Sequence, residues 1–263
     1  MRALLAQLCP RPGDVTANVA RAVDIVVSHP EAEFALFPEM FASGYRVDEL
    51  EPVAIRPSDG ALTPLAEAAG RAGTAVGVGF VERADEGYFN ALACFDAAGA
   101  LAAVYRKTHL FGAENDCFIP GDALAVVRLA GRRVAPLICF DAEFPEPARA
   151  AAAAGADLLI TVAANMEPEG LEQEIATRAR ALENRIPHLY VNRCGAEGSL
   201  EFAGGTRAIS AGGAVTAEAA GRGEEIVIAE VGPAGCTDER LDYLALSRGQ
   251  LPVCVTAGSQ EAT

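Results

Sequence analysis

The stretch VAPLICFDAEFPEPARAAAAAGADLLITV, residues 134–162, contains the signals of a strand, a helix and a second strand. Val134–Ile138 is a continuous apolar run, which predicts a buried strand. Pro147–Ala154 is rich in alanine, the strongest helix former, and Leu158–Val162 is a second apolar run. Two strands joined by a helical crossover run parallel. This stretch therefore predicts an α/β fold.

The same alternation of strands and helices extends to both sides. The other expected helices are Val15–Val27, Leu62–Ala72 and Leu171–Asn184. The other expected strands are Ala3–Leu8, Glu33–Phe37, Thr74–Val81, Phe89–Asp96, Leu101–Tyr105, Ala125–Leu129, His188–Asn192, Thr206–Ser210 and Glu225–Val231. Ala97–Ala100 indicates a hairpin turn, Gly112–Asp122 a loop, and Gly212–Gly213 a turn between the last two strands. The order is similar in both halves, which predicts mixed sheets flanked by helices, with pseudo-symmetric halves.

The length and composition are those of a globular protein. The chain has 263 residues, of which 51% are apolar and 22% are charged, which excludes a disordered or fibrous protein. We expect one domain over residues 1–232 and a tail over 233–263 that could serve as an oligomerisation arm. No run approaches the ~18 apolar residues of a membrane span. Gln7 and Pro10 stand where a signal peptide would be apolar, so we expect a cytoplasmic protein.

The net charge and the spacing of the cysteines and histidines exclude several classes of partner and of metal site. The net charge of -15 repels phosphate backbones and anionic lipids, so we expect neither nucleic acid nor a membrane as partner. The seven cysteines are scattered and never spaced C-x-x-C, which indicates neither a disulfide framework nor a structural zinc site. The three histidines, His29, His109 and His188, are too dispersed for a metal site. We expect no metal.

One basic residue differs from all the others. Of the 21 basic residues 20 are arginine, and Lys107 is the single lysine. Lysine supplies a compact ammonium whose pKa responds to burial, which arginine cannot do. From composition alone, an ordinary surface lysine remains an alternative.

Three apolar runs end at reactive side chains: Glu39, Lys107 and Cys139. The carboxyl ends of strands are where open α/β sheets gather ligands. A base, a cation and a thiol are the groups that acyl transfer through a thioester requires. Each residue has a structural alternative, since Cys139 could be an inert buried thiol and Glu39 a cap of the next element. Cys194, six residues after His188, is a rival nucleophile.

The segments around these residues resemble the three signature segments of the carbon-nitrogen hydrolases, the nitrilase superfamily. They are Phe37–Phe41, Tyr105–Phe111 and Ile138–Glu146, in the order and at the approximate intervals of the family. Further similar segments, reaching to about Val231, are Gly44–Tyr45, Asn90–Ala91, Pro120–Gly121, Ala164–Met166, Arg178–Asn184 and Cys194–Glu197. The chain departs at Gly204–Arg207, where family members often show Gly-x-Ser, which leaves the role of Arg207 open.

The resemblance implies an αββα sandwich of two mixed sheets flanked by helices. It also implies a catalytic triad of Glu39, Lys107 and Cys139, with Glu114 as a second glutamate after the lysine segment. Substrate contacts are expected from the three residues Phe140, Tyr45 and Asn165, with the Phe140 backbone N–H helping to hold an oxyanion. The family needs no metal or organic cofactor, and a homodimer or higher homo-oligomer is expected.

The implied reaction is hydrolysis of the C–N bond of a small linear aliphatic amide. True nitrilases resemble Cys-Trp-Glu, whereas Cys139–Asp141 is similar to the amidase and carbamoylase side. The wider motifs resemble aliphatic amidases of the 5-aminopentanamidase type, which suggests an amino group at the far end of the substrate. The first alternative is an N-carbamoyl amino acid hydrolase, in which Arg207 or Arg193 would hold the substrate carboxylate. The other is a catalytically silent relative that binds a partner or metabolite.

Overall fold

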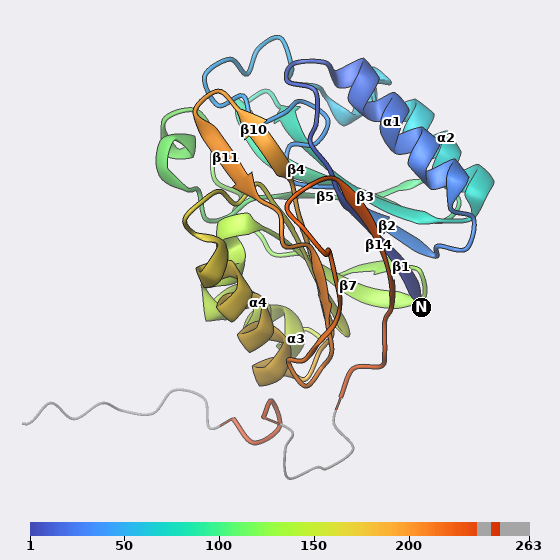
Figure 1. Ribbon diagram of the computed structural model, residues 1–263, viewed down its shortest axis with the longest axis vertical. Coiled ribbons are helices and arrows are strands. Elements are labelled where there is room, and N and C mark those ends of the chain that lie inside the picture. Colours follow the sequence, from blue (N-terminus) through green and yellow to red (C-terminus); the bar gives the residue numbers. More distant parts are fainter. Residues whose placement is uncertain (236–242, 248–263) are drawn as a thin grey trace, which may run out of the picture.

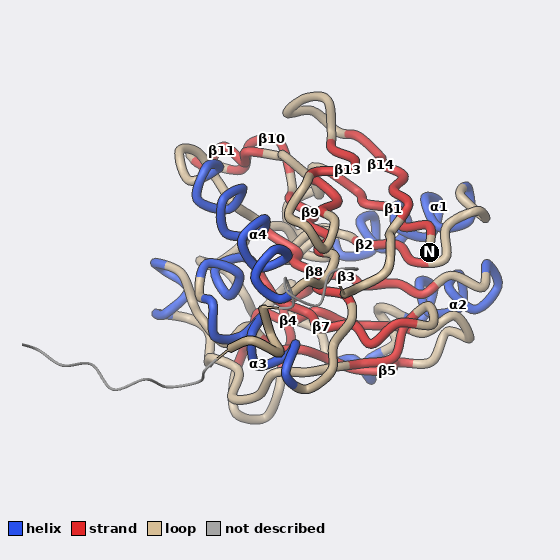
Figure 2. The backbone as a smooth tube through the Cα atoms, turned by 90° about the horizontal axis from the view of Figure 1, so that it is seen from below, coloured by secondary structure: helices blue, strands red, loops and turns tan. Residues whose placement is uncertain are grey.

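Two six-stranded sheets face each other, and a pair of helices covers the outer face of each sheet (Figure 1). The structure is a computed structural model and describes residues 1–235 and 243–247. Seen from below, the strands lie between the α1/α2 pair and the α3/α4 pair (Figure 2). This arrangement is the αββα sandwich expected from the sequence.

The first sheet has the strand order β14-β1-β2-β3-β4-β5. Its strands are β1 (Arg2–Gln7), β2 (Phe34–Leu36), β3 (Ala75–Arg83), β4 (Tyr88–Phe95), β5 (Leu101–Arg106) and β14 (Glu225–Glu230). The helices on its outer face are α1 (Val15–Ser28) and α2 (Thr63–Ala72). A short 3₁₀ helix, η1 (Pro57–Asp59), precedes α2.

The second sheet has the order β13-β12-β9-β8-β7-β6. Its strands are β6 (Val127–Leu129), β7 (Arg132–Ile138), β8 (Leu158–Ala163), β9 (His188–Asn192), β12 (Arg207–Ile209) and β13 (Val215–Glu218). Its outer face is covered by α3 (Pro145–Ala153) and α4 (Gly170–Asn184). Two 3₁₀ helices, η2 (Gly112–Asp116) and η3 (Cys139–Glu143), stand where the sequence predicted a loop and a strand end.

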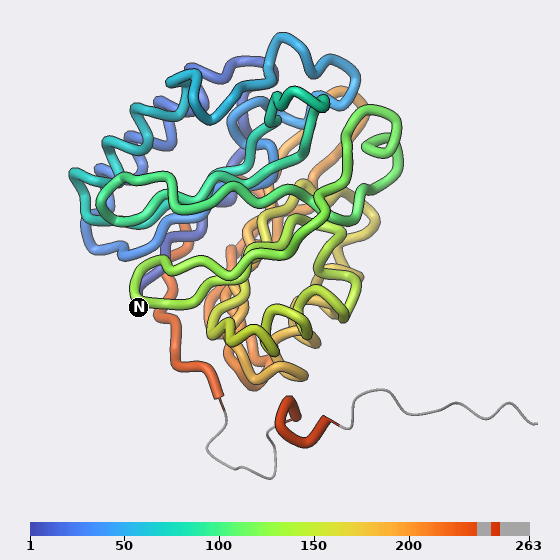
Figure 3. The backbone as a smooth tube through the Cα atoms, turned by 180° about the vertical axis from the view of Figure 1, so that it is seen from behind, coloured from blue at the N-terminus to red at the C-terminus, as the bar shows by residue number. Residues whose placement is uncertain are grey.

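The two halves repeat one topology, which confirms the predicted pseudo-symmetry. From β14 to β5 the successive pairs are antiparallel, parallel, parallel, antiparallel and antiparallel. From β6 to β13 the pairs follow the same sequence. Figure 3 shows the earlier half of the chain, blue to green, above the later half. The central parallel strands of both sheets thus present their carboxyl ends to one region.

The main core lies between the sheets. Phe34 and Leu36 of β2 belong to one buried cluster with Ile138 of β7 and Ile160 of β8. Strands buried on both faces read as continuous apolar runs rather than alternating ones, which is why the sequence pattern located them. Alanine-rich α3 packs closely on β7 through small side chains such as Ala148.

The structure corrects the predicted pairing of the last strands. The turn at Gly212–Gly213 joins β12 to β13, not to the last strand, and β14 crosses over to pair with β1. β13 and the separate hairpin β10 (Cys194–Glu197) and β11 (Leu200–Ala203) were not predicted. These strands are short and only partly buried, so they lack a clear apolar pattern.

Most of the predicted tail, residues 236–242 and 248–263, lies outside the described residues, so its role as an arm stays a prediction. The described part contacts the body: Leu244 packs against the cluster beneath α3, and the Arg185 guanidinium lies 4.2 Å from the centre of the Tyr243 ring. Among the helices of the described ranges, none combines the length and apolar character needed to cross a membrane.

Candidate active site

Cys139 stands at a sharp turn at the end of β7. Its φ is 44°, a left-handed conformation that residues other than glycine rarely adopt. The side chain of Gln173 in α4 donates a hydrogen bond of 3.3 Å from Nε2 to the Cys139 carbonyl oxygen. The residue is 9% exposed. The strand end and this turn hold the thiol at the carboxyl edge of the second sheet.

Lys107 reaches the same place from the first sheet, directly after β5. Its Nζ donates to Glu39 Oε1 at 2.8 Å and lies 2.8 Å from Glu114 Oε2 and 3.0 Å from Glu114 Oε1. Its backbone N–H donates to the Asn90 carbonyl oxygen at 2.8 Å. The single lysine is 1% exposed, so the alternative of a surface lysine is wrong.

Glu39 follows β2 and is also buried. Besides Lys107, its carboxylate accepts hydrogen bonds from Asn90 Nδ2 and from the Ala164 backbone N–H, both 2.6 Å long. These partners come from three separate segments, so Glu39 is no simple cap of the next element. A Cβ at Gly79 in β3 would collide with the Pro38 carbonyl oxygen and the Met40 nitrogen, so glycine there lets the Glu39 turn lie against the sheet.

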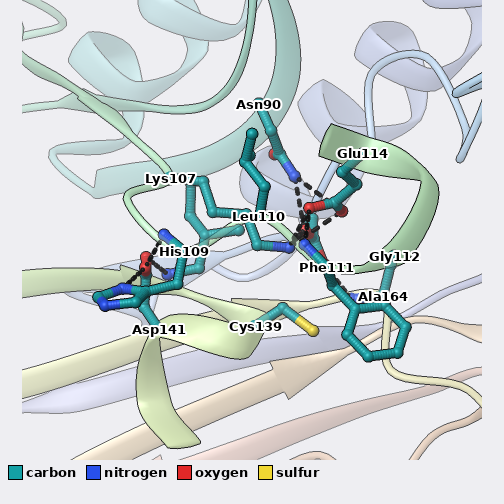
Figure 4. Close-up of polar contacts among 12 residues, drawn as sticks. Asn90, Lys107, His109, Leu110, Phe111, Gly112, Glu114, Cys139, Asp141 and Ala164 are labelled. Atoms are coloured by element: carbon teal, nitrogen blue, oxygen red, sulfur yellow. Dashed lines mark hydrogen bonds and ion pairs between the residues drawn. The ribbon is translucent and has the colours of Figure 1, made fainter. Parts of the chain in front are cut away.

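Glu114 lies in η2 and completes a cluster with Lys107 and Asn90 (Figure 4). Its Oε1 accepts the Tyr45 hydroxyl at 2.9 Å, and its Oε2 accepts the Phe111 backbone N–H at 3.0 Å. Glu114 is fully buried. The cluster thus holds one ammonium between two carboxylates.

Burial and charge set the protonation states. Burial raises the pKa of Glu39, and the Glu114 carboxylate raises it further, against the effect of Lys107. Burial lowers the pKa of Lys107, but Glu39 and Glu114 outweigh it and hold that pKa well above its usual value. Burial, together with the Glu39 carboxylate, raises the pKa of the Cys139 thiol well above its usual value. These shifts favour the neutral thiol of Cys139 and the ammonium of Lys107, and they make Glu39 a stronger base than an exposed glutamate.

A small pocket opens onto these groups. The cavity has a volume of about 40 Å³. The lining residues are Tyr45, Lys107, Phe111, Glu114, Cys139, Phe140, Glu143, Ala164, Asn165, Met166 and Glu169. The pocket thus includes Phe140, Tyr45 and Asn165, the residues predicted to contact substrate. Glu39 lies behind it, against Lys107 and the Ala164 backbone.

The rival pair does not come together. The His188 ring bonds the Thr161 hydroxyl and the Thr177 carbonyl oxygen, and burial lowers its pKa to about 4. The strand ends at Asn192, and Cys194 begins β10 in a different sheet. His188 and Cys194 therefore do not lie on one continuous strand.

Neither candidate arginine clamp lines the pocket. Arg193 is buried, with Nη1 2.6 Å from Glu197 Oε2 and its guanidinium over the Phe202 ring. Arg207 donates from Nε to the Gly205 carbonyl oxygen at 2.7 Å, and its Nη1 lies 3.3 Å from Glu174 Oε2. Arg207 thus bonds to its own neighbourhood, whereas Nε and Nη2 of Arg193 are buried without a hydrogen-bond partner in the described structure.

Some residues of the site were not singled out from the sequence. Asn90 lies in one of the segments that resemble the family, and Glu143 lies in the cysteine segment, so both carried a signal. Gln173 and Glu169 carried none, because α4 and the loop before it bring them in from a distant part of the chain. In the described ranges, no three His, Cys, Asp or Glu side chains are grouped as metal ligands.

Comparison with known proteins agrees with this geometry. The chain is 35% identical over 246 residues to an (R)-stereoselective amidase of Pseudomonas sp, covering 92% of this chain and 89% of that protein. It is 39% identical over 213 residues to a hydrolase encoded in the pqqF 5' region of Pseudomonas protegens, covering 78% of this chain and 73% of that protein.

The chain is also similar in fold to solved structures of an amidase. An amidase from Nesterenkonia sp. AN1, with the acetamide moiety of fluoroacetamide added covalently at its active site cysteine, has a TM-score of 0.82 and 31% identity over 94% of both chains. The profile of the family described as carbon-nitrogen hydrolase matches residues 2–240. The chain therefore belongs to the carbon-nitrogen hydrolase family, within the nitrilase superfamily, and is an enzyme that hydrolyses amide C–N bonds.

Proposed function

We propose that the enzyme hydrolyses a small linear aliphatic amide with an amino group at its far end, through a thioester on Cys139. The observation that carries this proposal is the pocket itself. Cys139, Lys107 and Glu114 line the same small pocket as two further acidic residues, Glu143 and Glu169. The products are a carboxylate and ammonia.

In the first half-reaction, the Glu39 carboxylate takes the proton of the Cys139 thiol as the sulfur attacks the amide carbonyl carbon. Lys107 and the Phe140 backbone N–H hold the oxyanion of the tetrahedral intermediate, a role worth roughly 3 kcal/mol per donor. Glu39 then gives its proton to the departing nitrogen, which leaves as ammonia. The raised pKa of Glu39 suits a group that must both accept and donate a proton.

In the second half-reaction, water attacks the thioester carbonyl carbon while Glu39 accepts one of its protons. The C–S bond breaks, and the proton on Glu39 restores the Cys139 thiol. Glu114 contacts Lys107 through both carboxylate oxygens and anchors the Tyr45 hydroxyl, so it orients the ammonium and the wall of the pocket. This cycle needs no metal or organic cofactor.

Two acidic side chains, Glu143 and Glu169, favour a substrate that carries an amino group. Glu169 Oε2 is buried and has no hydrogen-bond partner within the described structure. Burial raises the pKa of Glu143, and the neighbouring carboxylates of Glu172 and Glu169 contribute to this rise. A substrate ammonium placed between Glu143 and Glu169 would relieve the desolvation and the repulsion of both carboxylates.

Ammonia release from a matched panel tests the proposal. We expect 5-aminopentanamide to be hydrolysed with a kcat/KM at least ~10-fold above that of uncharged pentanamide. N-carbamoyl amino acids and nitriles are expected to react more slowly, since neither Arg193 nor Arg207 lines the pocket. Faster turnover of N-carbamoyl amino acids would favour the carbamoylase alternative. No hydrolysis of any substrate would favour the silent binding relative.

The Glu143→Gln and Glu169→Gln variants test recognition of the substrate amino group separately from hydrolysis of the amide. Each is expected to lower kcat/KM for 5-aminopentanamide ~10-fold and to leave pentanamide unchanged. The matched control is Glu146→Gln, an exposed carboxylate of the same segment outside the pocket. An equal loss on both amides would contradict the role in recognising the ammonium.

We also propose that the chain forms a homodimer or higher homo-oligomer. Leu171 and Ile175, one turn apart on α4, are 63% and 61% exposed, a large apolar exposure for a helix that covers a sheet. The cytoplasmic location expected from the sequence stays a prediction.

A further inference from the structure

Asp141 is a buried carboxylate of the cysteine segment that lies outside the pocket and bonds both to the lysine segment and to the residue before Cys139. Its Oδ1 accepts the Thr108 hydroxyl at 2.7 Å, the Thr108 N–H at 3.2 Å and the His109 N–H at 2.8 Å. His109 Nδ1 lies 2.9 Å from the same oxygen (Figure 4). Oδ2 accepts the Tyr105 hydroxyl at 2.8 Å and the Ile138 N–H at 3.0 Å.

These donors bracket the two reactive residues. Tyr105 and Thr108 stand on either side of Lys107, at the end of β5. Ile138 immediately precedes Cys139, at the end of β7. One carboxylate therefore joins the backbone that carries the ammonium to the backbone that carries the thiol.

This connection matters because β5 and β7 belong to different sheets. Hydrogen bonds of a sheet fix the register of its own strands but not the offset between two stacked sheets. Side-chain packing between sheets is compatible with small shifts, whereas a displacement of about 1 Å in a catalytic group can cost ~100-fold in rate. The ends of β5 and β7 therefore require a direct hydrogen-bonded connection between the two sheets to keep Lys107 and Cys139 in place.

We propose that Asp141 is the positioning residue that sets Lys107 against Cys139. The inference rests on the roles given above to these two residues. Asp141 does not act on substrate, since it contacts neither the pocket nor Nζ of Lys107. Its charge is stabilised locally: burial raises its pKa, but the hydrogen bonds from His109, Ile138 and other donors outweigh burial and hold that pKa below its usual value.

The decisive variant is Asp141→Asn, which keeps the size but turns one acceptor into a donor facing N–H and O–H groups. We expect kcat for the amide to fall ~30- to 100-fold while KM stays within about threefold, because the pocket is intact and only the reacting groups are offset. Steady-state kinetics, normalised to the concentration of folded protein, measure both constants.

Asp157→Asn is the matched control. Asp157 also accepts a backbone hydrogen bond at a strand end, from Arg133 N at 3.0 Å, but lies away from the site. We expect this variant to lose thermal stability and to keep its kcat. If both variants lower kcat in proportion to their loss of stability, Asp141 is merely structural and the inference is overturned.

If Asp141→Asn does not fold, the Tyr105→Phe variant tests the positioning role of Asp141 instead. It removes one hydrogen bond to Oδ2 without changing the shape of the side chain, and we expect a loss of kcat of about fivefold or more with KM unchanged. An unchanged kcat overturns the inference. A Cys139→Ala variant that still turns over would instead overturn the proposed function, so the two failures are distinguishable.

Discussion

The ammonium group of Lys107 is buried between the carboxylates of Glu39 and Glu114, and it contacts both of them. Its Nζ lies 2.8 Å from Glu39 and 2.8 Å from Glu114, with 1% of the residue exposed. Arginine, which this chain uses for every other cation, carries a wide planar group. The choice of lysine at this one position therefore follows from the volume and the fork geometry of the side chain.

Lys107→Arg should accordingly be severe. The guanidinium cannot sit beside both carboxylates and the oxyanion, so we expect at least a ~100-fold loss of kcat, the cost of one misplaced donor. Overpacking of a buried site should also lower stability by roughly 1–3 kcal/mol. Steady-state kinetics and thermal unfolding measure the two effects. A kcat within about threefold of wild type would mean that other groups hold the oxyanion.

Glu39 gives a prediction for the pH dependence. The residue acts as a base only when ionised, and burial raises its pKa above the ordinary 4.5 of a glutamate. Activity should therefore fall, as pH is lowered, at a higher pH than an exposed glutamate would cause. The acid limb of kcat/KM against pH measures this. A profile that stays flat down to pH 4.5 would contradict the raised pKa.

Cys139→Ala and Glu39→Gln test the chemistry directly. Alanine removes the nucleophile at little packing cost, so we expect a folded protein without turnover. Glutamine cannot accept the thiol proton, so Glu39→Gln should be nearly inactive, with thioester formation as the step that is lost. Thioester formation at the wild-type rate in Glu39→Gln would rule out the general-base role.

At the scale of elements, α4 reaches the turn of the nucleophile through Gln173, while Arg180 of the same helix bonds to the Ala142 and Glu143 carbonyl oxygens. Gln173 Nε2 donates to the Cys139 carbonyl oxygen and, at 2.8 Å, to Glu143 Oε1. It thus links the strained turn of the nucleophile to the acidic wall of the pocket. The helix that covers the second sheet also braces the turn.

Gln173→Leu should leave both acceptors without this donor. We expect kcat to fall ~10-fold and stability to drop by about 1–3 kcal/mol, the cost of unpaired buried polar groups. Thr177→Val is the control, since the Thr177 hydroxyl bonds only to backbone carbonyl oxygens of α4 itself. Equal effects of the two variants on kcat would show that the helix as a whole, and not Gln173, matters.

The long elements were predictable because their residues decide their structure locally. His188–Asn192 was predicted with the bounds of β9, since its apolar centre Leu189–Val191 favours a buried strand. The hairpin β10–β11 was not predicted. Its position depends on contacts with distant parts of the chain, such as the bridge between Met166 and Phe202. Strands of four residues with glycine carry little pattern of their own.

At the scale of the whole molecule, the site exists only where the two sheets meet. Glu39 and Lys107 follow strands of the first sheet, and Cys139 follows a strand of the second. The apolar runs marked these residues as candidates, and the resemblance to the family assigned them to a triad. The sequence could not place Asn90, Glu143 or Glu169 beside them, because that depends on how the layers stack.

The exposed apolar face of α4 gives the last prediction. A two-fold axis beside this helix would set Leu171 and Ile175 against the same residues of a second copy, a self-complementary contact of the kind that closes a dimer. Burying side chains of this size contributes about 1.5–3 kcal/mol each. The double variant Leu171→Gln with Ile175→Gln should therefore sediment as a smaller species than wild type at micromolar concentration. Val27→Gln, which changes an apolar residue 54% exposed on α1, should leave the assembly unchanged. Sedimentation of the double variant as wild type would place any interface elsewhere on the molecule.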